Sequence, residues 1–229
     1  MKNYLTLTIQ GENKLLTVEV KNIFNAGYAG RNQALVQEHI DELAKIGVPA
    51  PSTTPTLYPI SNYLATTSDV LQVQHGETSG EIEYVLIWAD GEVYVTVGSD
   101  HTDRNLENYS VPKSKQAYPN VIAPEVWKVD DVKDHWDELE LECWVIKDGK
   151  KDLYQKAKFT ALLAPDAWSE TFDRFKVAKD GNIFFSATVN TVGNMLVFGD
   201  QYEIELRDPV LNRSIKHAYN VEVLQKGIE

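Results

Sequence analysis

Apolar and polar residues alternate along much of the chain, which is the pattern expected of β-strands that bury one face. Runs of β-branched and aromatic residues follow this pattern in eight places. They predict strands at residues 5–9, 15–21, 81–88, 92–97, 138–146, 182–188, 201–208 and 218–224. Asp-Gly pairs at 90–91 and 148–149 predict hairpins, because both residue types tolerate the left-handed backbone of tight turns. A third pair, at 180–181, predicts a turn.

Residues 33–46 have helical spacing instead, and Gly47 is a natural stop for a helix. The apolar positions at this spacing are Leu35, Val36, Ile40, Leu43 and Ile46. Shorter helical segments are expected around 129–137 and 165–175. Four of the nine prolines fall within 47–59, so this segment is predicted to be extended and irregular. It is either a linker after a small N-terminal lobe or a loop tethered within one domain.

Strands therefore dominate over helices, which predicts a β-rich α+β fold with closed or face-to-face sheets. The 229 residues suffice for a substantial core. A net charge of −12 argues against a nucleic-acid surface, which needs clustered Lys and Arg. No apolar run is long enough to span a membrane, and the alternating N-terminus predicts a strand rather than a signal peptide. The single cysteine, Cys143, excludes an internal disulfide and fits a reducing compartment, so we expect a cytoplasmic protein.

Two glutamates stand out in the strand 81–88, because both faces of that strand are largely apolar. Glu81 and Glu83 share one face, with Cβ atoms about 7 Å apart. Hairpin pairing with the strand 92–97 would bring Asp100 towards them. Buried carboxylates without partners cost several kcal/mol each, so they take up protons unless a cation joins them. Three carboxylates without His or Cys favour Mg²⁺ or Mn²⁺. Two alternatives stay open: glutamates at a hydrated strand end that bind nothing, or a Ca²⁺ site that serves stability alone.

The segment "SDHTDRNLE" at 99–107 resembles the N-D-x-[ST]-A-R-D-x-Q motif of the fumarylacetoacetate hydrolase family. Asp100, Thr102 and Arg104 match the motif, whereas other positions depart from it. Four further segments resemble family landmarks in the same order along the chain. They are "AGRNQALVQEHIDEL", "SKQAYPNVIAPEVW", "WDELELECWVIKDGKKDLYQ" and "FFSATVNTVGN". The last lacks the Gly and Pro of the family's T-G-T-P loop. The resemblance spans residues 28–224 and is nearest to a subgroup known only as a domain of unknown function.

This resemblance implies one domain over residues 1–229 with a mixed β-sandwich roll. Residues 1–50 would form the N-terminal strands and a short lid helix, and residues 51–229 the β-rich catalytic body. It also implies a homodimer and a Mg²⁺-dependent enzyme, with Mn²⁺ as an alternative ion. The substrate would be a small oxo-carboxylic acid, a keto or diketo acid. The reaction would be C–C bond hydrolysis, decarboxylation or keto–enol isomerisation. The rival interpretation is a β-rich binding or structural module that kept the fold and lost activity.

The same resemblance assigns roles to individual residues. Glu81, Glu83 and Asp100 would hold the metal. His39 and Glu42 lie three residues apart on one helix face, so Glu42 could orient His39 as a general acid or base. The remaining assignments are Lys115 as the residue that balances negative charge, Thr188 as a substrate contact, and Arg104 either as a substrate contact or as a brace for Asp100.

Overall fold

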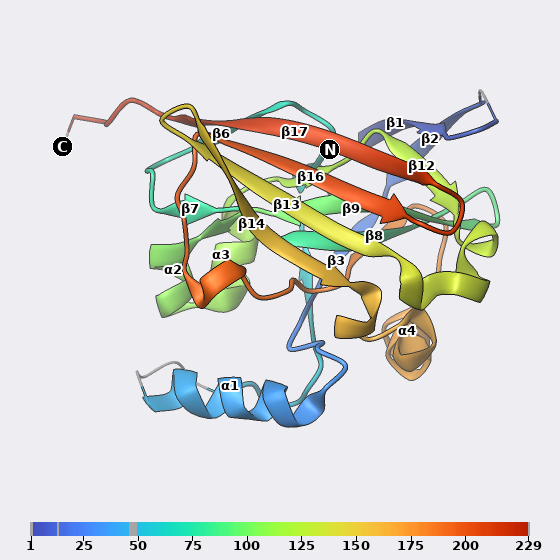
Figure 1. Cartoon of the computed structure of the whole chain (residues 1–229), viewed down its shortest axis with the longest axis horizontal. Helices are drawn as coiled ribbons and strands as arrows, with labels where there is room; N and C mark the ends of the chain where they lie inside the picture. Colours follow the sequence, from blue (N-terminus) through green and yellow to red (C-terminus); the bar gives the residue numbers. More distant parts are fainter. Residues whose placement is uncertain (1, 13, 46–49, 229) are drawn as a thin grey trace.

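A strongly curled sheet of ten strands forms the larger part of the structure, a computed structural model that describes residues 2–12, 14–45 and 50–228 (Figure 1). Its strand order is β2-β1-β12-β9-β8-β15-β3-β4, with β11 paired to β9 and β5 paired to β11. The bounds are β1 (Asn3–Ile9), β2 (Lys14–Val20), β3 (Asn22–Gly27), β4 (Thr56–Ile60), β5 (Ala65–Thr66), β8 (Ile82–Ala89), β9 (Glu92–Asp100), β11 (Asn120–Ile122), β12 (Glu125–Lys128) and β15 (Asn182–Phe185). The sheet is mixed, because β1 pairs with β12, and β3 with β15, in parallel.

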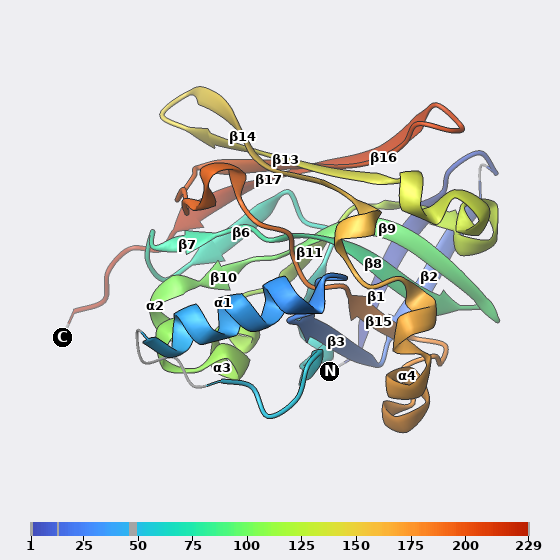
Figure 2. The same ribbon diagram turned by 60° about the horizontal axis from the view of Figure 1, so that its bottom comes forward.

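A second sheet of five strands packs across β8 and β9 (Figures 1 and 2). Its order is β14-β13-β16-β17-β6. The bounds are β6 (Val70–Val73), β13 (Glu140–Lys147), β14 (Lys150–Lys158), β16 (Gln201–Asp208) and β17 (Arg213–Val223), and a separate short pair joins β7 (Thr78–Ser79) to β10 (Thr102–Asp103). Two packed sheets with few helices confirm the predicted β-rich α+β class.

Helices are short and lie mostly outside the sheets. The α-helices are α1 (Gln33–Lys45), α2 (Arg104–Tyr109), α3 (Val111–Ala117) and α4 (Ser169–Phe175), and the 3₁₀ helices are η1 (Asn62–Leu64), η2 (Val129–Asp131), η3 (Lys133–Glu138), η4 (Phe159–Ala161), η5 (Pro165–Trp168) and η6 (Val192–Asn194). All three predicted helical segments are confirmed, although the expected stop at Gly47 lies outside the described residues. Helix α1 lies on the opposite side of the molecule from the five-stranded sheet (Figure 1). Among the described residues, no helix has the length and apolar composition that crossing a membrane requires.

Strand β8 lies between two apolar cores, as its two apolar faces predict. Every residue of β8 is buried. Tyr84 and Leu86 belong to the core between the two sheets, whereas Val85 and Ile87 belong to the core inside the curl of the larger sheet. The even and odd positions of one strand thus serve different cores. Glu83 is therefore on a strand with no solvated face.

Turn chemistry sets the register that matters for the site. Asp90 and Gly91 have φ values of 54° and 76°, the left-handed pair that a two-residue hairpin requires. This turn pairs β8 with β9 so that Glu83 faces Gly98 and Ile82 faces Ser99. The hairpin between β13 and β14 is formed in the same way. Both predicted hairpins are confirmed.

Three expectations about strands need correction. The predicted strand 182–188 ends at Phe185, because Ala187 takes a left-handed φ of 72° and turns the chain away. The predicted strand 218–224 begins earlier, at Arg213. The end of the proline-rich segment is not irregular, since β4 pairs with β3 at the sheet edge, where Pro59 is tolerated. The N-terminal strands are therefore hydrogen-bonded into the same sheet as β8 and β9.

Candidate metal centre

Three buried carboxylates converge where β8 and β9 meet. Oxygen atoms of Glu81, Glu83 and Asp100 all lie within 4.8 Å of one another. The hairpin brings them together, because the backbone N–H of Asp100 donates to the carbonyl of Glu81 over 3.1 Å. Glu81 immediately precedes β8, and Asp100 is the last residue of β9. Strand β9 therefore extends three residues beyond the predicted end at residue 97 and includes Asp100. The convergence expected from the sequence is present.

Lys115 enters this cluster from α3. Its ammonium group makes an ion pair and hydrogen bond with Asp100 and lies 3.8 Å from Glu81 Oε2. Burial works to lower the pKa of Lys115, but Asp100, Glu81 and Glu83 outweigh it and hold the pKa above its usual range. Lys115 is therefore charged. Lys113, two residues earlier, is exposed.

Arg104, at the start of α2, braces Glu81. Its Nη1 donates to Glu81 Oε1 and to Glu107 Oε2, each over 2.8 Å, and its Nε donates to Ser79 Oγ over 2.8 Å. Among the described residues its carboxylate partners are thus Glu81 and Glu107. Of the two roles left open for Arg104, the brace acts on Glu81 and not on Asp100, because α2 turns the guanidinium towards the start of β8. A contact with substrate stays a prediction.

The cluster carries more negative than positive charge. Four carboxylates against two cationic side chains leave a formal charge of −2 when all are ionised, and the six residues are Glu81, Glu83, Asp100, Glu107, Arg104 and Lys115. Burial raises the pKa of Glu83 well above its usual range and also raises the pKa of Asp100. Burial acts on Glu81 too, but Arg104 and Lys115 outweigh it and lower its pKa.

Two oxygens of the cluster are buried and lack a hydrogen-bond partner among the described residues: Glu83 Oε1 and Asp100 Oδ1. Leaving such atoms unsatisfied in a site of low dielectric is costly. A small divalent cation would supply both the missing partners and the missing positive charge. Oxygen donors without His or Cys suit Mg²⁺ or Mn²⁺. The residues present therefore fit the expected metal.

The chain after β15 fixes Glu83 and uses Thr188 structurally. The backbone N–H of Ala187 donates to Glu83 Oε2 over 2.9 Å. The Thr188 hydroxyl donates to the carbonyl of Ile82 over 2.9 Å and accepts from Gln155 Nε2 over 2.8 Å. Gln155 Oε1 in turn accepts from the backbone N–H of Ile82. Thr188 thus lies beside the cluster with its hydroxyl engaged. Gln155, which received no role from the sequence, joins the two sheets next to the site.

His39 and Glu42 lie in α1, at the predicted spacing. Their side chains lie outside what the structure describes. Their roles as an acid–base pair stay a prediction.

A buried asparagine pair borders the cluster and was missed by the sequence reasoning. Asn120 Nδ2 donates to Asn25 Oδ1 over 3.0 Å, and both side chains are fully buried. Asn120 pairs directly with Asp100 across β11 and β9. Each asparagine interrupts an apolar run, "NIFNAG" or "PNVIA", and a polar residue inside such a run is the signal that could have identified them.

His101 points away from the carboxylates into the core between the sheets, as strand alternation predicts. Its Nε2 lies 2.9 Å from Thr78 Oγ1, and its Nδ1 lies 3.1 Å from the Tyr219 hydroxyl, which is 2.8 Å from Ser99 Oγ. Burial lowers the pKa of His101 to about 3, so the ring is neutral. These contacts tie the end of β9 to the five-stranded sheet.

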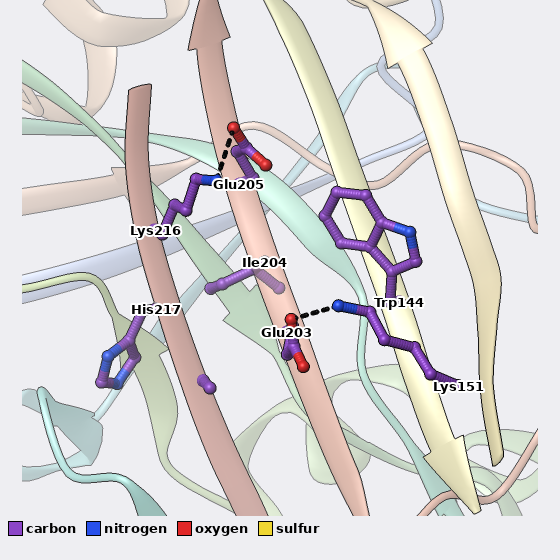
Figure 3. Close-up of a pocket in the computed structure, with 8 residues that line it drawn as sticks. Trp144, Lys151, Glu203, Ile204, Glu205, Lys216 and His217 are labelled. Carbon is purple, nitrogen blue, oxygen red and sulfur yellow. Dashed lines mark hydrogen bonds and ion pairs between the residues drawn. The ribbon is translucent and has the colours of Figure 1, made fainter. Parts of the chain in front are cut away.

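A shallow depression of about 510 Å³ lies elsewhere, on the outer face of the five-stranded sheet (Figure 3). Trp144 borders it, and its charged side chains pair locally. Lys151 Nζ lies 2.5 Å from Glu203 Oε2, and Lys216 Nζ lies 3.4 Å from Glu205 Oε1. Both lysines are exposed to solvent, and ion pairs at a solvent-facing surface contribute little energy and suggest no chemistry.

Comparisons with known proteins agree with this architecture. A family model described as "Protein of unknown function (DUF2848)" matches residues 26–219. A hexagonal crystal form of 2-keto-3-deoxyarabinonate dehydratase has a TM-score of 0.66 and 14% identity, covering 93% of this chain and 79% of that one. The structure of 2-keto-3-deoxy-D-arabinonate dehydratase complexed with magnesium and 2,5-dioxopentanoate has a TM-score of 0.64 and 14% identity to this chain. The match covers 95% of this chain and 79% of that one. The structure of Cg1458 with inhibitor has a TM-score of 0.62 and 17% identity, and the match covers 90% of this chain and 78% of that one. No curated protein matches the sequence.

These likenesses concern the fold. They confirm the resemblance to a fumarylacetoacetate hydrolase-like fold and to a subgroup of unknown function that the motifs indicated.

Proposed function

We propose that this chain, which belongs to the DUF2848 family of proteins of unknown function, is a Mg²⁺-dependent enzyme acting on a small oxo-carboxylic acid. The observation that carries the proposal is the buried cluster of Glu81, Glu83 and Asp100, whose negative charge exceeds its positive charge. A neighbour of the same fold is named as a dehydratase complexed with magnesium and 2,5-dioxopentanoate, which supports the same ion and substrate class. Mn²⁺ is the alternative ion.

Within this proposal Glu81, Glu83 and Asp100 hold the metal. The chemistry that a bound Mg²⁺ supplies is Lewis-acid polarisation of a carbonyl oxygen. Arg104 fixes one oxygen of Glu81 through its 2.8 Å hydrogen bond, so that carboxylate cannot rotate freely. Lys115 offsets negative charge that develops on the substrate oxygen. The burial of these groups excludes water and strengthens each electrostatic contact.

The acid–base part of the proposal rests on α1. His39, oriented by Glu42, would move a proton or activate water. C–C bond hydrolysis, decarboxylation and keto–enol isomerisation all develop negative charge next to the keto group, so the same side chains serve each of them.

A catalytically inactive module of the same fold is the alternative function. The Thr188 hydroxyl favours it, because this hydroxyl is already hydrogen-bonded to Ile82 and Gln155. A homodimer, a single domain over 1–229 and a cytoplasmic location stay predictions.

Thermal unfolding with metal and oxalate tests the binding part. Mg²⁺ at a hundred times its Kd is expected to stabilise the protein by about 2.7 kcal/mol, because it binds only the folded state. Oxalate, which mimics the enolate of a 2-oxo acid, is expected to stabilise further only when Mg²⁺ is present. Stabilisation by oxalate without metal would contradict the proposed site. Turnover of oxaloacetate or an acylpyruvate with Mg²⁺ would exclude the inactive module.

A further inference from the structure

Glu81, one of the three proposed metal ligands, lies between β7 and β8 and belongs to neither strand. Its buried backbone N–H donates to a side chain, the hydroxyl oxygen of Ser99, over 3.1 Å. A buried N–H needs such a partner, because leaving it unpaired costs about as much as a lost hydrogen bond. The place of Glu81 in the cluster therefore depends on where the Ser99 hydroxyl lies.

Further side chains hold that hydroxyl in place. Ser99 Oγ lies 2.8 Å from the Tyr219 hydroxyl oxygen, which lies 3.1 Å from Nδ1 of His101. The other ring nitrogen of His101 lies 2.9 Å from Oγ1 of Thr78, three residues before Glu81. All four side chains are buried. This buried hydrogen-bond network of Thr78, His101, Tyr219 and Ser99 therefore fastens the segment 78–81 at both of its ends.

The backbone just before Glu81 packs directly on the same network. A Cβ atom at Gly80 would lie 2.6 Å from the Tyr219 hydroxyl oxygen, which is too close for any residue but glycine, and 3.1 Å from Ser99 Oγ. The segment thus lies against the two hydroxyl groups with no side chain between them. A shift of either hydroxyl therefore moves the backbone that carries Glu81.

Resting on the proposed function, we infer that Tyr219, held by His101, is a positioning residue: acting through Ser99, it fixes the backbone of Glu81 where the metal requires its carboxylate. Arg104 holds the carboxylate end of Glu81, and the network holds the backbone end. A ligand fixed at both ends has its oxygens in place before the ion arrives. Removing partners that orient a metal ligand weakens metal binding roughly 10–100-fold. A network that only joins the two sheets would instead affect stability and leave metal affinity unchanged.

Calorimetric titration with Mg²⁺ tests this inference on the wild type, Ser99→Ala, Tyr219→Phe and the double variant. Ser99→Ala removes the acceptor of the Glu81 N–H and is expected to weaken Mg²⁺ binding about tenfold. Tyr219→Phe removes only the hydroxyl that orients Ser99, so its expected loss is smaller, roughly fivefold. Because Tyr219 acts through Ser99, the double variant should bind Mg²⁺ no more weakly than Ser99→Ala does. Multiplied losses would contradict a shared route.

Tyr84→Phe is the matched control, because Tyr84 is buried in the same core and its hydroxyl donates to the carbonyl of Leu163 over 2.7 Å, outside the network. Both Tyr→Phe variants are expected to lower Tm by about 2–4 °C, the effect of one buried hydrogen bond in a chain of this size. Only Tyr219→Phe should weaken Mg²⁺ binding. Equal Mg²⁺ affinity of the wild type, Ser99→Ala and Tyr219→Phe would overturn the positioning role and leave the proposed function standing. Absence of Mg²⁺ binding to the wild type would overturn both.

Amide hydrogen exchange in the metal-free protein measures the hold of the network on Glu81 without the ion. The Glu81 N–H is expected to exchange about tenfold faster in Ser99→Ala than in Tyr84→Phe, because only the first variant opens this segment locally. Tyr219→Phe should act in the same direction. Equal exchange rates of this N–H in Ser99→Ala and Tyr84→Phe would overturn the positioning role whether or not the protein binds Mg²⁺.

Discussion

Lys115→Met is expected to destabilise the metal-free protein by about 3–5 kcal/mol, because it leaves buried carboxylates without their cation. For a chain of this size that corresponds to roughly 6–20 °C in Tm. Mg²⁺ should restore most of the loss, since a bound divalent ion supplies the charge that the variant lacks. Turnover is expected to stay low even with metal, because the residue that balances charge on the substrate is gone. Urea unfolding with and without Mg²⁺ measures the loss of stability and its recovery, and a turnover assay with Mg²⁺ measures the loss of activity.

Lys113→Met is the matched control for this experiment. Lys113 lies two residues earlier on α3 with its side chain exposed, so its loss should change the free energy of unfolding by less than about 0.5 kcal/mol. Equal behaviour of the two variants would remove Lys115 from the cluster. A Lys115→Met protein that unfolds early and gains nothing from Mg²⁺ would show that the carboxylates do not bind the ion.

Glu83→Gln is expected to raise the stability of the metal-free protein by about 2 kcal/mol and to abolish stabilisation by Mg²⁺. Oε1 of Glu83 is buried without a partner, and the neutral amide removes a charge that burial disfavours. Because the pKa of Glu83 is raised in the folded state, wild-type stability falls as pH rises from the ordinary carboxyl range through the raised pKa. The advantage of glutamine should therefore be absent at pH values below the ordinary carboxyl pKa and largest at pH values above the raised pKa of Glu83.

Glu142→Gln provides the contrast, because Glu142 is also buried but has partners. Lys156 Nζ lies 2.6 Å and Arg207 Nη1 lies 3.2 Å from Glu142 Oε1, and burial is outweighed so that its pKa is lowered. Its glutamine variant should lose stability above the ordinary carboxyl pKa and should keep the full response to Mg²⁺. Thermal unfolding across pH, with and without Mg²⁺, compares the two. A loss of stability in Glu83→Gln would mean that Glu83 is a satisfied structural acid.

The part of the site that the sequence predicts is the part that local chemistry determines. The Asp90–Gly91 turn sets the register of β8 and β9, and that register places Asp100 beside Glu81. Strand alternation likewise predicts the opposite directions of Asp100 and His101. These features depend on neighbours in the chain, so a pattern of residues is enough to reveal them.

The part that remained hidden depends on contacts between distant segments. Helices α2 and α3 have only six and seven residues and no apolar periodicity, so nothing local predicts that α3 directs Lys115 inward. Its place came from the family resemblance alone. Strand β3 pairs in parallel with β15, more than 150 residues away, which concealed Asn25 from a strand-by-strand reading. The helix carrying His39 and Glu42 was predicted correctly, yet the role of its side chains stays a prediction.

Anomalous diffraction from crystals grown with Mn²⁺ shows whether the three carboxylates bind a divalent ion, because it locates the ion without relying on activity. We expect an anomalous peak among the carboxylate oxygens of Glu81, Glu83 and Asp100, and its loss in Glu83→Gln crystals. A cluster with no peak at saturating Mn²⁺, and with Lys115 still paired to Asp100, would contradict it.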